Sequence, residues 1–169
     1  MLAPVTTDTR PVWSGICSAV QRGFFCLPSS VVMWHTLSRR PAAEPPAEAL
    51  RQAVWVAMAA CADGDEHSGR ALRVVQLILR TPALRARFLE HQAQWRDDLA
   101  VETAHRLGLD PETDLSPRLA AEAALAAFDT ALRRWSDSDG AEDPAALTDR
   151  AFAFLAPALD AAGPYGVSR

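Results

Sequence analysis

Residues 118–135 read Arg-Leu-Ala-Ala-Glu-Ala-Ala-Leu-Ala-Ala-Phe-Asp-Thr-Ala-Leu-Arg-Arg-Trp, and this stretch carries the clearest structural signal in the chain. Apolar side chains recur in it at intervals of three and four residues, which is the period of one face of an α-helix. The small ones are Ala120, Ala124, Ala127 and Ala131, and the large ones are Leu125, Phe128, Leu132 and Trp135. The pattern predicts a helix that opens at Ser116-Pro117, reaches Trp135 and has two apolar faces.

A helix of the same design is expected at the C-terminal end, from the capping pair Asp143-Pro144 to about Leu159. Two helices with two apolar faces each have more surface to bury than one small core consumes. The surplus faces predict a homodimer in which these helices form a two-fold four-helix bundle. The expected dimer interface consists of Ala120, Ala124, Ala127, Ala131, Phe154 and Ala158. The alternative is that both faces of each helix belong to one internal core.

Further helices are expected before these two, at Ser29/Ser30 to Arg39, Pro46 to Ala62, Gly69 to Arg80 and Pro82 to Leu107. Thr81 is the expected N-cap of the longest, with proline at its first position, and Gly108 ends it. The helix from Gly69 to Arg80 is apolar over most of its circumference and is therefore expected at the centre. The fold class is all-α, a bundle of five to six helices without a convincing pair of strands.

The composition is that of an ordinary soluble globular protein, with 49% hydrophobic and 22% charged residues among 169. That length gives room for one domain with a short appendage. The longest apolar run, Ala53 to Ala62, is about half of the ~20 residues that a membrane-spanning helix needs. The cysteines are widely spaced without a CxxC pair, and no secretory signal opens the chain. We therefore expect a cytoplasmic protein with no disulfide framework and no membrane partner.

The N-terminal part differs in charge from the rest of the chain. Residues 1–41 hold four arginines and one aspartate, a net of +3, so the remainder must carry −7 to reach the total of −4. A basic end on an acidic body is typical of a DNA-facing segment attached to a sensor, although a solvated basic arm has the same composition. Three prolines in residues 41–46 close this segment, because they do not allow a helix to continue.

Several phrases of the body occur in a characteristic order. They are Thr-Pro-Ala-Leu-Arg-Ala-Arg-Phe-Leu-Glu (81–90), Gln-Trp-Arg-Asp (94–97), Arg-Leu-Gly-Leu-Asp-Pro (106–111), the stretch 118–135 quoted above, and the terminal phrase 152–159. In this order and spacing they resemble the C-terminal ligand-binding and dimerisation domain of TetR-family transcriptional regulators, over about residues 47–160. The resemblance implies transcription regulation by a homodimer that senses a small-molecule effector. It assigns ligand binding and dimerisation to residues 46–162, with a flexible tail at 163–169.

Residues 22–32 read Arg-Gly-Phe-Phe-Cys-Leu-Pro-Ser-Ser-Val-Val, which is similar to the phrase that ends the helix-turn-helix of this family. Gly23 stands where the family has threonine, and no lysine follows Ser29. Only about twenty residues precede the phrase, too few for the two helices that pack behind a recognition helix. Residues 1–45 are therefore expected to be an N-terminal arm, or the remnant of a truncated or degenerate DNA-binding headpiece, with a Pro-rich linker. DNA is an expected partner only if a working headpiece exists.

Large side chains on three of the expected helices are predicted to converge on a pocket for an apolar small-molecule effector. The set is Trp55, Met58, Phe88, His91, Gln92, Trp95 and Phe128. The alternative is that the aromatics fill the core, with His91 and Gln92 at its polar edge. Binding to the pocket would shift the helix that carries His91 and Trp95, which in an intact relative would change the spacing of the DNA heads.

The sequence contains few signs of a metal site or of a catalytic site. The Glu102–His105 ExxH spacing lacks the second such pair that a di-iron bundle needs. No hydrolase, zinc-protease or nucleotide-binding motif is found. We therefore expect no catalytic residues, no metal and no cofactor, and hence no enzyme. The expected function is ligand sensing and dimerisation in a TetR-type regulator. The competing interpretation is a dimeric interaction module, a degenerate regulator that binds neither DNA nor a ligand.

Overall fold

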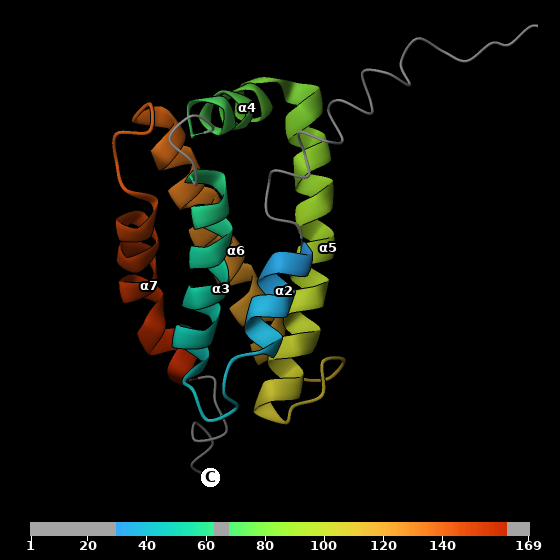
Figure 1. Cartoon of the computed structure of the whole chain (residues 1–169). Helices are drawn as coiled ribbons and strands as arrows, with labels where there is room; N and C mark the ends of the chain where they lie inside the picture. Colours follow the sequence, from blue (N-terminus) through green and yellow to red (C-terminus); the bar gives the residue numbers. More distant parts are fainter. Residues whose placement is uncertain (1–29, 63–67, 162–169) are drawn as a thin grey trace, which may run out of the picture.

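The computed structural model describes residues 30–62 and 68–161, and within these ranges every regular element is a helix (Figure 1). The helices are α2 (Ser30–Ser38), α3 (Pro46–Ala62), α4 (Ser68–Arg80), α5 (Pro82–Leu107), α6 (Leu115–Asp137) and α7 (Pro144–Ala161). The all-α class predicted from the sequence is confirmed. The predicted helix ends agree with the observed ones to within about two residues.

The two ends of α5 follow from local backbone chemistry. Thr81 has the extended backbone of an N-cap but its side chain makes no capping hydrogen bond, and Pro82 occupies the first turn, where no amide donor is needed. At the other end Gly108 adopts a left-handed conformation with φ 65°, and its N–H donates to backbone carbonyls of the last turn. A side chain with a Cβ is strained at that φ, so glycine is the residue that ends α5 cleanly.

The turn between α6 and α7 reverses the chain so that these helices pack together. Asp139 and Gly140 both have positive φ, and a Cβ on Gly140 would lie 3.2 Å from Leu72 Cδ2. The carboxylate of Asp143 then accepts hydrogen bonds from the N–H groups of Ala145 and Ala146, which caps α7. The cap predicted at Asp143 is therefore confirmed.

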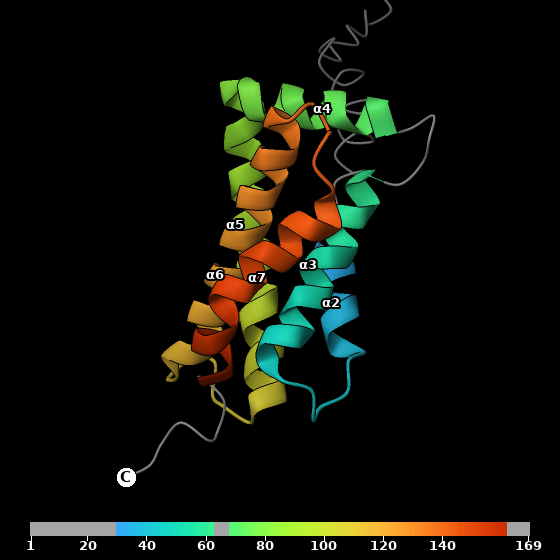
Figure 2. The ribbon, with the colours of Figure 1, turned by 90° about the vertical axis from the view of Figure 1, so that its left-hand side faces the viewer.

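Long helices form the body of the bundle, with α3, α5, α6 and α7 running along it in both views (Figures 1 and 2). The closest pairings are α3 with α7 and α5 with α6, and α6 also packs against α7. Helix α2 lies against α3 and α5, where Met33 and Leu37 are fully buried. Helix α2 therefore contributes to the same core as α3 and α5.

Helix α4 lies across one end of the bundle, at the top of Figures 1 and 2, and the prediction that it is central was wrong. Val75 and Ile78 are buried, whereas the opposite side of α4 is exposed. That exposed row consists of Arg70, Arg73, Leu77 and Arg80. Its arginines recur at the helical period, so α4 is amphipathic and covers the end of the core with one face.

Some expectations concern residues that the structure does not describe. The N-terminal arm up to residue 29, including most of the phrase at 22–32, lies outside the described residues, and so does the tail at 163–169. Within the described ranges, no helix combines the length and the apolar character needed to cross a membrane.

Candidate ligand-binding site

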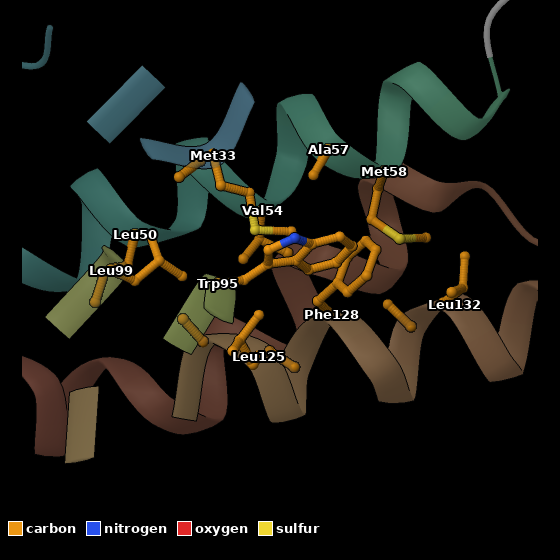
Figure 3. Packing of buried hydrophobic residues seen from close by; sticks show 14 of the residues in the cluster. Met33, Leu50, Val54, Ala57, Met58, Trp95, Leu99, Leu125, Phe128 and Leu132 are labelled. Atoms are coloured by element: carbon orange, nitrogen blue, oxygen red, sulfur yellow. The ribbon is translucent and has the colours of Figure 1, made fainter. Parts of the chain in front are cut away.

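Trp95 lies at the centre of an aromatic cluster inside the bundle. Its indole meets the ring of Phe88, two helical turns earlier on α5, edge to face at a centroid distance of 5.9 Å. It meets Phe128 of α6 in a similar arrangement at 6.1 Å. All three side chains are buried, and Trp95 and Phe128 are seen beside each other in Figure 3. This edge-to-face geometry is the one that aromatic quadrupoles favour.

Two methionines extend the cluster from other helices. Met58 of α3 was predicted for the site and is fully buried in the same core (Figure 3). Met33 of α2 was not predicted, yet it is buried in the same core and points into it in Figure 3. The sequence signal for Met33 was its place within an apolar segment of a short predicted helix. Both side chains are flexible, so this wall of the cluster can adapt its shape.

Two of the residues predicted for the pocket, Trp55 and His91, are not fully buried. Trp55 is 38% exposed and belongs to the outer face of α3, which also carries Glu48 and Arg51. It faces away from the stripe with Val54 and Met58, because neighbouring residues of a helix are about 100° apart. His91 is half-buried on α5, at the margin of the buried face. The structure therefore gathers Met58, Phe88, Trp95 and Phe128 with Gln92, and leaves Trp55 outside.

The inner face of α5 also carries two polar side chains without visible partners. Gln92 is 6% exposed and Thr103 is 3% exposed. The Nε2 of Gln92 and the Oγ1 of Thr103 have no hydrogen-bond partner among the described residues. The buried Nε of Arg96 makes no well-aligned hydrogen bond either, but it lies 2.6 Å from Glu122 Oε1, and that ion pair compensates its charge. Gln92 and Thr103 are therefore the unmatched groups of this face.

Three hollows lined by described residues lie away from the aromatic cluster. One of about 20 Å³, between α2, α3 and α5, is bordered by Thr103 and Arg106. A groove of about 550 Å³ runs between α3 and α7 over Phe152. A third hollow, of about 350 Å³, lies between α4 and the α6–α7 turn. None of the three is lined by any of the seven predicted pocket residues.

The residues predicted for a dimer interface divide into two groups. The alanines of α6, Ala120, Ala124, Ala127 and Ala131, are buried within the single chain. Phe154 and Ala158 of α7 are exposed, and Phe154 has 85% of its surface accessible. The small side chains therefore serve close helix packing inside one chain, while the α7 residues remain on its surface.

The solvent-exposed side of α6 and α7 carries several apolar residues. On α6, Leu115 and Leu119 are one turn apart, and Leu119 is 65% exposed. Ala126 is exposed further along the same face of α6. We call the exposed residues Leu115, Leu119, Ala126, Phe154 and Ala158 the outer α6–α7 face. The sequence signal for Leu119 lay in the quoted stretch, at the edge of the alanine row.

Arg51 of α3 binds two carboxylates, of which Asp149 lies on α7 and joins the two helices. Its Nη1 donates to Asp149 Oδ1 of α7 at 2.6 Å, and its Nε and Nη2 donate to Glu48 one turn earlier on α3. The hydrogen bond from Arg51, aided by one from Gln52, lowers the pKa of Glu48 to about 2, although partial burial acts in the opposite direction. The same pairing raises the pKa of Arg51.

Arg106 of α5 binds the end of α2, and no pattern in the sequence predicts this contact. Its Nη1 donates to the carbonyls of Leu37 and Arg40, and its Nη2 donates to the carbonyl of Pro41 at 2.8 Å. These carbonyls belong to the last turn of α2 and the residues after it, where acceptors lack helical partners. An arginine in the last turn of a helix gives no sequence signal for a partner about 65 residues away.

A comparison with protein families adds an independent finding. The family model described as the MftR C-terminal domain, one of the TetR-type C-terminal domains, matches residues 44–160. That range contains α3 to α6, all of α7 but its last residue, and the aromatic cluster with Met58 but without Met33. A comparison with curated proteins found no match to the chain.

Proposed function

The chain belongs to the MftR C-terminal domain family of TetR-type regulators, and on that premise we propose that it senses an apolar small molecule and dimerises within a transcriptional regulator. The observation that carries the proposal is the Trp95 cluster with the buried amide of Gln92 beside it. Large apolar walls with a few polar groups are typical of small-molecule sites. The proposed site consists of Met58, Phe88, His91, Gln92, Trp95 and Phe128.

Dimerisation is proposed through the outer α6–α7 face. Its support is the exposure of large apolar side chains on two packed helices, with Phe154, Leu115 and Leu119 the most exposed. Exposed apolar patches of this kind mark interaction surfaces, and closed two-fold pairing is the commonest form of oligomer. The buried alanines of α6 then act indirectly, because they set how closely α6 approaches its own neighbours.

The ligand proposal is tested by tryptophan fluorescence during titration with an apolar probe such as decane. Binding beside Trp95 should change its emission by altering the surroundings of the indole, and Trp95→Phe should remove that response while it keeps an aromatic ring in the cluster. Trp55→Phe is the matched control, because Trp55 lies on the outer face of α3, and it should keep the response. A change in emission that survives in Trp95→Phe and disappears in Trp55→Phe would contradict the proposed site.

A second candidate function is a dimeric interaction module without a ligand. The observation in its favour is that Phe88 and Phe128 both pack directly against Trp95. A dimer with unchanged fluorescence and unchanged thermal stability at saturating probe would favour this candidate. A DNA retardation assay with genomic fragments tests whether the chain itself binds an operator. Specific operator binding typically has a dissociation constant of ~10⁻⁸ to 10⁻¹¹ M.

A further inference from the structure

Gln92 is placed where an apolar residue would be expected. It lies on the inner face of α5, between Phe88 and Trp95, and is more than nine-tenths buried. Its Nε2 carries two N–H donors, and no described residue accepts a hydrogen bond from them. Buried side-chain donors are nearly always paired, because an unpaired donor loses its water without replacement. A leucine or methionine of similar size would avoid that loss, so the amide requires an acceptor from elsewhere.

The surroundings restrict what kind of acceptor this can be. The buried polar side chains of the described core are Gln92, Thr103, Ser136 and Thr148, and none of them is charged. The nearest arginine on the same helix, Arg96, is already paired with Glu122. A charged group of a ligand would therefore meet no buried counter-ion in the cluster, which is strongly unfavourable. An uncharged oxygen meets the requirement of the amide without that penalty.

We propose that the ligand of this domain is an apolar molecule with an uncharged hydrogen-bond acceptor, such as a ketone or ester carbonyl, and that Gln92 Nε2 donates to it. The apolar part packs against Phe88, Trp95 and Phe128. The flexible side chains of Met33 and Met58 adjust to make room for it. This inference rests on the proposed sensing function and assigns Gln92 as the residue that selects the ligand class.

Three ten-carbon probes test the inference, namely decane, methyl octyl ketone and decanoate, which share one chain length and differ in the polar group. Their affinities are measured by tryptophan fluorescence on the full chain. The ketone should bind about tenfold more tightly than decane, the factor that one well-formed hydrogen bond of ~1.4 kcal/mol provides. Decanoate should bind the most weakly. In Gln92→Leu the preference for the ketone over decane should disappear.

Thermal unfolding without any probe gives a second readout. Gln92→Leu should melt at a higher temperature than the wild type, because it removes an unpaired buried donor. Gln76→Leu is the matched control, since Gln76 donates to Asp139 and to the carbonyl of Ser136, and it should lower the melting temperature and keep the ketone preference. Gln92→Met replaces Gln92→Leu if the branched side chain prevents folding.

The outcomes separate this inference from the function on which it rests. If none of the three probes binds, the sensing function itself fails. If decane and the ketone bind equally well to the wild type, sensing stands and the role of Gln92 is overturned. The role is also overturned if Gln92→Leu and Gln92→Met both destabilise the unliganded protein as Gln76→Leu does, because Gln92 would then have a partner within the protein.

Discussion

Small side chains on the inner side of α6 determine how closely its neighbours can approach. Ala124 is completely buried at the centre of this helix, whereas Ala126, two positions on, is exposed. The difference follows from helix geometry, because residues two apart point to different sides. Alanine is therefore a buried packing residue at one position of this stretch and an exposed surface residue at another.

Ala124→Glu should unfold the domain, although the sequence pattern alone suggested a change of oligomeric state. An uncompensated buried charge costs on the order of 3–5 kcal/mol, which is a large part of a typical stability of ~5–15 kcal/mol. Circular dichroism during urea titration measures the loss. Ala126→Glu is the control and should stay within about 0.5 kcal/mol of the wild type. Equal effects of the two variants would contradict the burial of Ala124.

The pairing of Glu48 with Arg51 within α3 makes the stability of the fold sensitive to acid. The pKa of Glu48 lies near 2 in the folded chain and near 4.5 otherwise, so its carboxylate stabilises the fold above about pH 4.5, and this contribution is lost as the pH falls towards 2. The stability difference between wild type and Glu48→Gln should therefore shrink over that interval. Because the side chain of Glu48 is 38% exposed, the effect should be small.

Chemical denaturation at a series of pH values measures this dependence. Glu90→Gln is the control, because Glu90 forms the same kind of i,i+3 pair with Arg87, in which the side chain of Glu90 is 63% exposed. A wild-type advantage over Glu48→Gln that is constant from pH 5 to pH 2 would be inconsistent with the Arg51 hydrogen bonds as the cause of the lowered pKa.

On the scale of whole helices, α2 depends on α5 for the satisfaction of its last carbonyls. Arg106 supplies three hydrogen bonds to that end, and Met33 and Leu37 anchor the rest of α2 in the core. Since α5 also carries Gln92 and Trp95, the proposed ligand site and the anchor of α2 belong to one rigid element. A displacement of α5 would therefore also move the end of α2 that Arg106 binds.

Arg106→Ala should loosen α2 before the rest of the bundle. The loss of charge-assisted hydrogen bonds at a partly exposed site should cost about 2 kcal/mol. Hydrogen–deuterium exchange should become faster in residues 32–40 than in α6 or α7. Arg118→Ala, which removes an exposed pair with Asp97 at 3.8 Å, should leave the exchange of α2 unchanged. Uniformly faster exchange in every helix would argue against a local anchor.

At the scale of the molecule, the outer α6–α7 face is the surface proposed to meet a second copy of the chain. Phe154→Glu should convert a dimer into a monomer with an intact fold, because Phe154 is exposed in the single chain and a charge there is buried only in the dimer. Light scattering coupled to size-exclusion chromatography at micromolar concentration measures the mass. Leu77→Glu on the exposed side of α4 is the control and should remain dimeric. A monomeric wild type would refute the dimer.

Much of the fold was accessible from local signals in the chain. Apolar periodicity located the described helices, and Thr81-Pro82, Gly108 and Asp143 marked where α5 begins and ends and where α7 begins, because capping and φ preferences depend only on neighbouring residues. The cluster of Phe88, Trp95 and Phe128 was also expected, since spacing put Phe88 and Trp95 on one face of α5.

Tertiary packing settled what periodicity leaves open. A helix with two apolar faces does not reveal which one its own chain covers, and only the packing of α6 within the bundle put Ala124 inside and Leu119 outside. Trp55 and Met58 lie one turn apart along α3, yet the neighbouring helices bury Met58 and leave Trp55 on the surface. Arg106 and the carbonyls after α2 are far apart in the sequence, so their contact exists only once the chain has folded. Burial and long-range pairing depend on which elements meet, and that information lies in the relations between helices rather than within any one of them.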